Sequence, residues 1–167
     1  DSSIATVNFS LQPNAGTDGG IAICDNSTAT IDLYSLITGE QAGGTWIRTV
    51  GVGGIFDALT GTFAPAVGST TSNFIYTLAA TAPCVSDSSE AIVTISSIPT
   101  GITITGSTTT CAGIPVNLTV SGTPGTVITW TGTPSSFTIG ASGSNVISVA
   151  PIASTIYTLT SASLNGC

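Results

Sequence analysis

The sequence contains no lysine, histidine or methionine, and Arg48 is its only basic side chain. Eight acidic residues give a formal net charge of −7, yet charged residues are only 5% of the chain, against about 25% in an ordinary soluble domain. Because phosphate binding needs Lys and Arg, we expect no nucleic acid partner. No apolar run approaches the roughly 20 residues that a membrane-spanning helix needs, so we also expect no membrane insertion.

The missing basic residues also argue against catalysis. A nucleophilic Ser or Thr needs a neighbouring base such as His or Lys, and neither residue type is present. The acidic residues stand mostly beside Gly, Ser and Asn in predicted turns, where Asp typically hydrogen-bonds its own backbone. The glycines at 16–20 and 51–54 lack a Lys and a following helix, so we interpret them as turn glycines rather than phosphate loops. We therefore expect a non-enzymatic protein with no catalytic residue and no cofactor.

A metal site has little support in the sequence. Calcium binds carboxylate and carbonyl oxygens in loops, which makes Asp18, Asp25 and Asp57 weak calcium candidates. No Asp-x-Asp-x-Asp run accompanies them, and the cysteines form no Cys-x-x-Cys pair. We expect no metal ligand.

An internal repeat is the strongest positive signal. Cysteine, tryptophan, tyrosine and cysteine recur in one order with similar spacing, as Cys24, Trp46, Tyr76, Cys84 and as Cys111, Trp130, Tyr157, Cys167. Residues 87–96 (DSSEAIVTIS) also match residues 1–10 (DSSIATVNFS). This repeat indicates tandem modules. We interpret residues 1–11 as the closing strand of a preceding module, 12–98 as a first module, and 99–167 as a second module that is incomplete at its C-terminal strand, all cut from a longer array.

Four cysteines allow three pairings, and the repeat favours one bridge in each module. We therefore predict Cys24 with Cys84 and Cys111 with Cys167. Each bridge would close a loop of about 60 residues and contribute on the order of 4 kcal/mol in the chain-entropy model. Disulfides persist in oxidising compartments, so we expect an extracellular, surface-exposed protein.

The pattern of apolar residues is that of β-strands. The chain is 41% hydrophobic, and short segments rich in Val, Ile and Thr alternate with period two between turn residues. The predicted strands are 5–9, 30–33, 45–49, 73–78, 91–95, 102–105, 116–120, 127–131, 137–139, 146–149 and 155–159, with one helical turn at 33–37. Six to seven strands and a Trp between two cysteines are typical of an immunoglobulin-like sandwich. We predict an all-β tandem of immunoglobulin-like β-sandwich modules, with Trp46, Trp130, Tyr76 and Tyr157 as core aromatics and the tryptophans packed on the bridges.

A family resemblance rests on particular segments. The segments CDN (24–26), DLYSLITG (32–39), GGTW (43–46) and FIYTL (74–78), followed by Cys84, resemble repeats of giant gliding-motility adhesins of Bacteroidota. The segments VITW (127–130), TIYTL (155–159) and NGC (165–167) resemble their PKD-like companions. The resemblance implies large cell-surface proteins exported by type IX secretion, whose repeats form adhesive or motility filaments. It brings no catalytic or ligand-binding residue.

These observations lead to a structural function, with alternatives. We expect a semi-rigid spacer and self-association unit of a cell-surface adhesin or filament, whose partners are further copies or neighbouring modules of the same protein. The main alternative is an array of carbohydrate-binding modules that binds surface polysaccharide, with Trp46 and Trp130 as exposed stacking platforms. An accessory stalk of an enzyme comes third. Buried tryptophans would favour the structural role.

The incomplete second module leads to one more expectation. It lacks a counterpart of residues 87–96, so one edge of its sheet should be open, and open edges accept added strands. We expect a segment like residues 1–11 to fill that edge, supplied by the continuing chain or by another copy. We also expect residues 1–11 to pair with no strand of their own first module.

Overall fold

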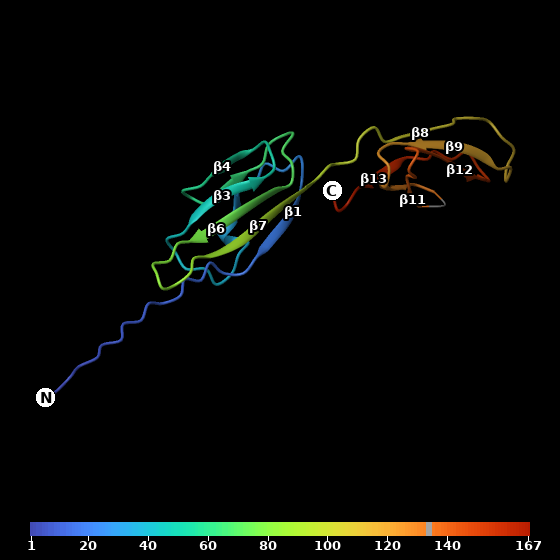
Figure 1. Cartoon of the computed structure of the whole chain (residues 1–167). Helices are drawn as coiled ribbons and strands as arrows, with labels where there is room; N and C mark the ends of the chain where they lie inside the picture. The colour runs from blue at the N-terminus through green and yellow to red at the C-terminus, as the bar shows by residue number, and fades with distance from the viewer. Residues whose placement is uncertain (133–134) are drawn as a thin grey trace. The chain divides into compact units, whose positions relative to one another are not determined.

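A computed structural model describes residues 1–132 and 135–167. The described chain is all-β with a single short 3₁₀ turn, so the predicted all-β class is confirmed. It divides into two compact units, Asp1–Ile95 (unit 1) and Ser96–Cys167 (unit 2) (Figure 1). We describe each unit by itself.

Unit 1 is built from two sheets. A four-stranded sheet has the order β1-β7-β6-β3, and a three-stranded sheet has the order β2-β5-β4. A 3₁₀ turn, η1 (Leu33–Ser35), follows β2, and the Asp32 side chain accepts a hydrogen bond from the Tyr34 amide at its start. The strands are β1 (Gly19–Cys24), β2 (Ile31–Asp32), β3 (Thr45–Val50), β4 (Ile55–Asp57), β5 (Thr62–Ala64), β6 (Ser72–Leu78) and β7 (Asp87–Ser96).

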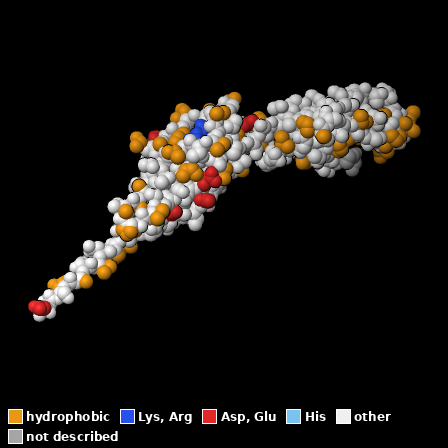
Figure 2. Space-filling model, in the orientation of Figure 1, with side chains coloured by type: hydrophobic (Ala, Val, Ile, Leu, Met, Phe, Trp, Pro, Cys, Tyr) orange, Lys and Arg blue, Asp and Glu red, His pale blue; other side chains and the backbone are white. Residues whose placement is uncertain are grey.

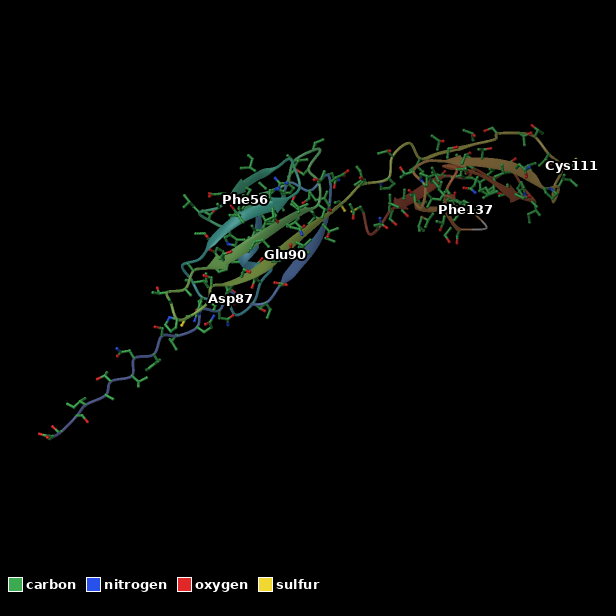
Figure 3. The ribbon with its side chains drawn as sticks, in the orientation of Figure 1. Phe56, Asp87, Glu90, Cys111 and Phe137 are labelled. Atoms are coloured by element: carbon green, nitrogen blue, oxygen red, sulfur yellow. The ribbon has the colours of Figure 1, made fainter. Side chains whose placement is uncertain are left out.

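Strand β7 lies between β1 and β6, and its two neighbours run in opposite directions. Strand β6 is antiparallel to it, with Phe74 opposite Ala91. The segment leading into β1 runs parallel to β7: the Ala15 amide donates to Asp87 Oδ2 at 2.7 Å, and the Glu90 amide donates to Asp18 Oδ1 at 2.8 Å. In both pairs the two residues are 72 positions apart in the sequence. A constant separation of this kind is expected for parallel segments and not for antiparallel ones. Figure 3 shows Asp87 and Glu90 along this strand.

The predicted turn glycines at 16–20 include two strand residues. Gly19 and Gly20 belong to β1, and the reason is close backbone packing. A Cβ on Gly19 would collide with the Leu36 carbonyl oxygen, and one on Gly20 would lie 2.5 Å from the Ile92 carbonyl oxygen. Glycine in a strand therefore marks a close approach of two backbones here. Gly51, Gly53 and Gly54 have positive φ, as turn glycines do.

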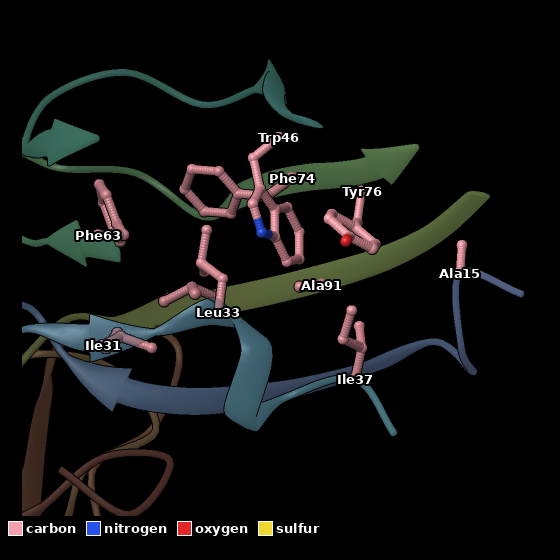
Figure 4. Packing of buried hydrophobic residues seen from close by; sticks show 10 residues of the cluster. Ala15, Ile31, Leu33, Ile37, Trp46, Phe63, Phe74, Tyr76 and Ala91 are labelled. Atoms are coloured by element: carbon pink, nitrogen blue, oxygen red, sulfur yellow. The ribbon is translucent and has the colours of Figure 1, made fainter. Parts of the chain in front are cut away.

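An aromatic cluster fills the space between the two sheets of unit 1 (Figure 4). The Tyr34 ring meets Trp46 and Tyr76 edge-on, at centroid distances of 5.5 and 5.3 Å. Edge-to-face contacts of this kind add to the gain from burial alone. The Tyr76 hydroxyl donates to the Gln41 carbonyl at 2.7 Å and accepts from the Gly44 amide at 2.8 Å. This side chain therefore ties the turn before β3 to the core.

Unit 2 repeats the two-sheet arrangement with fewer strands. One sheet has the order β11-β10-β13 and the other β12-β9-β8. Leu118, Val120, Ile128, Trp130, Ile147 and Val149 form its buried core, drawn from both sheets. The strands are β8 (Thr103–Thr105), β9 (Val116–Ser121), β10 (Val127–Trp130), β11 (Ser136–Thr138), β12 (Ser144–Val149) and β13 (Leu159–Ser163).

Most predicted strands overlap an observed one, and two do not match. The strand predicted at 155–159 is displaced, because β13 begins only at Leu159. Residues 5–9, also predicted as a strand, are assigned no strand and have no ladder partner among the described residues. Their apolar side chains are almost fully exposed, with Ile4 at 92%, Val7 at 91% and Phe9 at 86%. Figure 2 shows these hydrophobic side chains along the extended N-terminal segment. Its assignment to a preceding module stays a prediction.

We expect Tyr76→Phe to lower the free energy of unfolding of the chain by about 1–2 kcal/mol. The substitution keeps the buried ring but leaves the Gln41 carbonyl and Gly44 amide without their shared partner. Chemical denaturation followed by tryptophan fluorescence measures this loss. Tyr157→Phe is the matched control, because no hydrogen bond of the Tyr157 hydroxyl occurs among the described residues. Equal effects of the two variants would contradict the role given to Tyr76.

Candidate functional site

The cysteines do not pair as the repeat predicted. Cys24 and Cys167 are disulfide-bonded, whereas Cys84 and Cys111 carry free thiols. Neither predicted bridge forms, so the prediction of one disulfide in each module, with a tryptophan packed on it, is wrong. The topology of each unit explains why.

In unit 1 the parallel course of β1 and β7 separates the two cysteines. Cys24 ends β1, level with the end of β7, whereas Cys84 precedes the start of β7 and its Sγ lies 3.5 Å from the Ser10 carbonyl oxygen. The 10 residues of β7 lie between these levels, roughly 30 Å at about 3.3 Å per residue. A disulfide needs Cα atoms about 4.4–6.8 Å apart, so Cys24 and Cys84 cannot meet.

In unit 2 the strand β9 separates the other predicted pair. Cys111 lies before β9 begins, and the neighbouring Gly113 amide donates to the Pro151 carbonyl. Cys167 lies in a turn closed by hydrogen bonds with Leu164, whose side chain is near Gly125, after the end of β9. The two cysteines are therefore at opposite ends of the unit (Figure 1, Figure 3). A bridge between them would need the backbone to move.

The four predicted core aromatics lie inside the two units. Trp46 is 2% exposed, Trp130 is 3% exposed and Tyr76 is fully buried. Tyr157 is partly buried against the core of unit 2. No hydrogen-bond partner of the Trp130 indole nitrogen occurs in the described part of the chain. Neither tryptophan presents a planar face to solvent, which a sugar-stacking platform requires.

Arg48, the single basic residue, is held by neutral groups. Its guanidinium donates to the Gly53 carbonyl and to Ser72 Oγ, each at 2.6 Å. The same group lies 5.1 Å from the centre of the Phe63 ring. Partial burial lowers the pKa of Arg48, but a guanidinium stays charged throughout the physiological range. Sequence analysis assigned it no role, and its position on the core face of β3 indicates that it fastens the 50–54 loop.

The three calcium candidates occupy separate places. Asp18 accepts the Glu90 amide before β1, and Asp57 accepts the Leu59 amide at 2.9 Å in the turn after β4. That hydrogen bond lowers the pKa of Asp57. Asp25 follows the end of β1. The described residues contain no group of three or more metal-ligating side chains, and the Asp57 turn is the backbone-capping arrangement that the sequence predicted.

Unit 2 has one feature that the residue motifs did not reveal. A hollow of about 490 Å³ lies between the chain leading into β13 and the sheet that contains β8 and β9. It is lined by Ile104, Val116, Leu118, Pro151, Thr155 and Tyr157, among others. No charged residue occurs anywhere in 91–167, so the hollow is neutral and partly apolar.

Comparisons with known proteins add no relative. No protein family model, no curated protein and no solved structure matches this chain. Among the described residues, no helix is long and apolar enough to cross a membrane.

We expect two reactive thiols per chain when the native protein is treated with a thiol-specific chromogenic reagent without reductant. Cys111 is exposed and should react first, and the less exposed Cys84 should follow. Cys84→Ser and Cys111→Ser should each remove one equivalent, whereas Cys24→Ser should not reduce the count. A count of zero in the unreduced, unfolded chain would show that Cys84 and Cys111 are bonded and would contradict their assignment as free thiols.

Proposed function

We propose that the chain is a non-enzymatic, extracellular structural segment of a cell-surface adhesin or filament. In this proposal its two units are immunoglobulin-like, PKD-like sandwiches that act as a semi-rigid spacer and as a self-association unit. Such a segment would come from the gliding-motility adhesins of Bacteroidota that are exported by type IX secretion.

Strand order supports the immunoglobulin-like assignment. In that fold, strands B, E and D form one sheet and C, F and G the other. Unit 1 has β2-β5-β4 in one sheet and β3-β6-β7 in the other, with β1 added beside β7. Unit 2 has the corresponding sheets β8-β9-β12 and β11-β10-β13, in which β13 takes the place of F.

The observation that carries the proposal is the burial of the repeated aromatic residues. Trp46, Trp130 and Tyr76 are at most 3% exposed, so these three aromatic residues of the repeat serve the cores. A repeated surface ligand site would require such residues outside. The same burial disfavours the carbohydrate-binding alternative.

Surface composition supports the extracellular and self-associating parts. The disulfide-bonded Cys24 and Cys167 fit an oxidising compartment. Large apolar side chains such as Leu59 and Val67 are more than 90% exposed, and 5% charged residues provide little repulsion between copies. Low charge and exposed apolar side chains favour association of β proteins.

We expect the native chain to associate reversibly as its concentration rises. Its few charged side chains cause little repulsion between copies, and open sheet edges can accept another strand. Sedimentation velocity over a range from about 1 to 500 μM measures the change in mass. Oligosaccharide titrations followed by tryptophan fluorescence provide the comparison, and they should leave Trp46 and Trp130 unperturbed. A chain that is monomeric throughout and changes its fluorescence with a sugar would support the carbohydrate-binding alternative instead.

A further inference from the structure

In unit 1, strand β7 completes the sheet beside β6. It pairs with the edge of β6 that does not face β3. Its inward residues Ala91 and Val93 are fully buried and lie opposite Phe74 and Ser72 of β6. One strand therefore supplies both the ladder partner of β6 and part of the core.

Unit 2 has no such strand among its described residues. Strand β13 pairs with β10 on one side, and no described strand pairs with its other side. The chain continues the same course before β13, where the Thr131 amide donates to the Thr158 carbonyl at 2.9 Å. Residues 151–157 of this stretch line the neutral hollow. The hollow thus lies where the inward side chains of a β7 counterpart would belong.

Two sequence correspondences identify a matching segment. Residues 155–159 (TIYTL) correspond to residues 74–78 (FIYTL) of β6, with Tyr157 in the place of Tyr76. Residues 1–10 correspond to β7 (87–96), with six of ten positions identical. The chain therefore holds a second copy of the β7 sequence at its N-terminus, where no described strand pairs with it.

The register between β6 and β7 of unit 1 predicts how residues 1–10 would pair with residues 151–159. The pair of Phe74 with Ala91 becomes Thr155 with Ala5. The pair of Ser72 with Val93 becomes Ala153 with Val7. Phe74 and Ser72 are fully buried, as are their partners Ala91 and Val93. Ala5, Val7 and, with the same alternation, Phe9 would therefore take the inward positions, toward the hollow that Thr155 and Ala153 line with their neighbours.

We propose that residues 3–9 of a second copy of this chain bind along residues 151–157 of unit 2 as an added antiparallel strand, with Ala5, Val7 and Phe9 in the hollow. This inference rests on the proposed function and makes its self-association specific. The donor segment and the acceptor edge are different surfaces, so the contact between two copies is head-to-tail and can extend to further copies.

The chemistry of both partners fits this contact. Main-chain hydrogen bonds provide affinity in strand addition, and side-chain pockets provide specificity. Val7 and Phe9 are 91% and 86% exposed in the free chain, so their burial removes apolar surface from water. Residues 2–10 and the acceptor stretch carry no charged side chain, so no ion must be desolvated. In unit 1 the equivalent position is already taken by β7.

The first test compares Val7→Asp with Ile4→Asp in the full chain. Val7 and Ile4 are 91% and 92% exposed, and each variant adds one negative charge to the same segment. The proposed register places Val7 in the hollow and Ile4 on the opposite face. We expect Val7→Asp to weaken association in sedimentation at least tenfold and Ile4→Asp to change it less than threefold. Equal effects of the two variants would overturn the register.

The second test is complementation of a donor variant by an acceptor variant. Ala153 is exposed and lines the hollow, so Ala153→Trp should block the acceptor without altering a buried position. We expect chains with Val7→Asp and chains with Ala153→Trp each to remain monomeric. Their equimolar mixture should form dimers and nothing larger, because one intact donor and one intact acceptor remain. A synthetic peptide of residues 1–11 should compete with wild-type association.

Failure of this inference is distinct from failure of the proposed function. If wild-type chains associate and Val7→Asp associates equally well, strand donation is wrong while self-association stands. If the mixture stays monomeric, strand donation is likewise wrong. A third outcome is a wild-type chain that is a monomer and whose 1–11 segment becomes sensitive to protease only after Ala153→Trp. In that case the segment occupies the hollow of its own chain, and a second copy is excluded.

Discussion

The four-stranded sheet of unit 1 depends on β7, which lies between its parallel neighbour β1 and its antiparallel neighbour β6. This strand places Ala91 and Val93 in the core and brings the Asp87 carboxylate to the Ala15 amide. The Asp18 carboxylate accepts a similar hydrogen bond from the Glu90 amide. Charge-assisted hydrogen bonds of this type are stronger than neutral ones, so the few carboxylates of the chain stabilise the junction where β1 joins the sheet.

Scarcity of charge shapes the rest of the molecule. Arg48 is used to hold a loop against Phe63, and the carboxylates of Asp32 and Asp57 cap backbone turns. Beyond residue 90 no charged side chain remains. Natural sheets commonly protect their edges with charge, and unit 2 has none available. Its open side along β13 is therefore chemically suited to another strand.

The two units differ in how they reach a closed core. In unit 1 Trp46 and Tyr76 are almost fully buried, and Tyr34 of η1 packs edge-on against both rings. In unit 2 Trp130 is equally buried, but Tyr157 is only partly covered, beside the hollow. Similar residue patterns thus lead to different degrees of closure because the number of strands differs.

The sequence alone determined the β class and most strand positions, because alternation with period two and β-branched composition are local properties. It also predicted that the tryptophans are buried, but from their place between cysteines that do not form the predicted bridges. It also predicted the capping role of Asp57, since an Asx turn involves only neighbouring residues. It missed the short strands β4 and β5. It also missed β1, where Gly19 and Gly20 make close backbone contacts with Leu36 and Ile92, which are distant in sequence. It also misplaced the strand near Leu159.

Only the tertiary structure decided which cysteines are bridged and where a hollow remains. Equal spacing of cysteines in a repeat says nothing about the end of a sheet at which each lies. The parallel course of β1 and β7 moves Cys24 away from Cys84, and β9 separates Cys111 from Cys167. Disulfide formation and cavity shape depend on distances in space, and these are set by strand direction and order rather than by position along the chain.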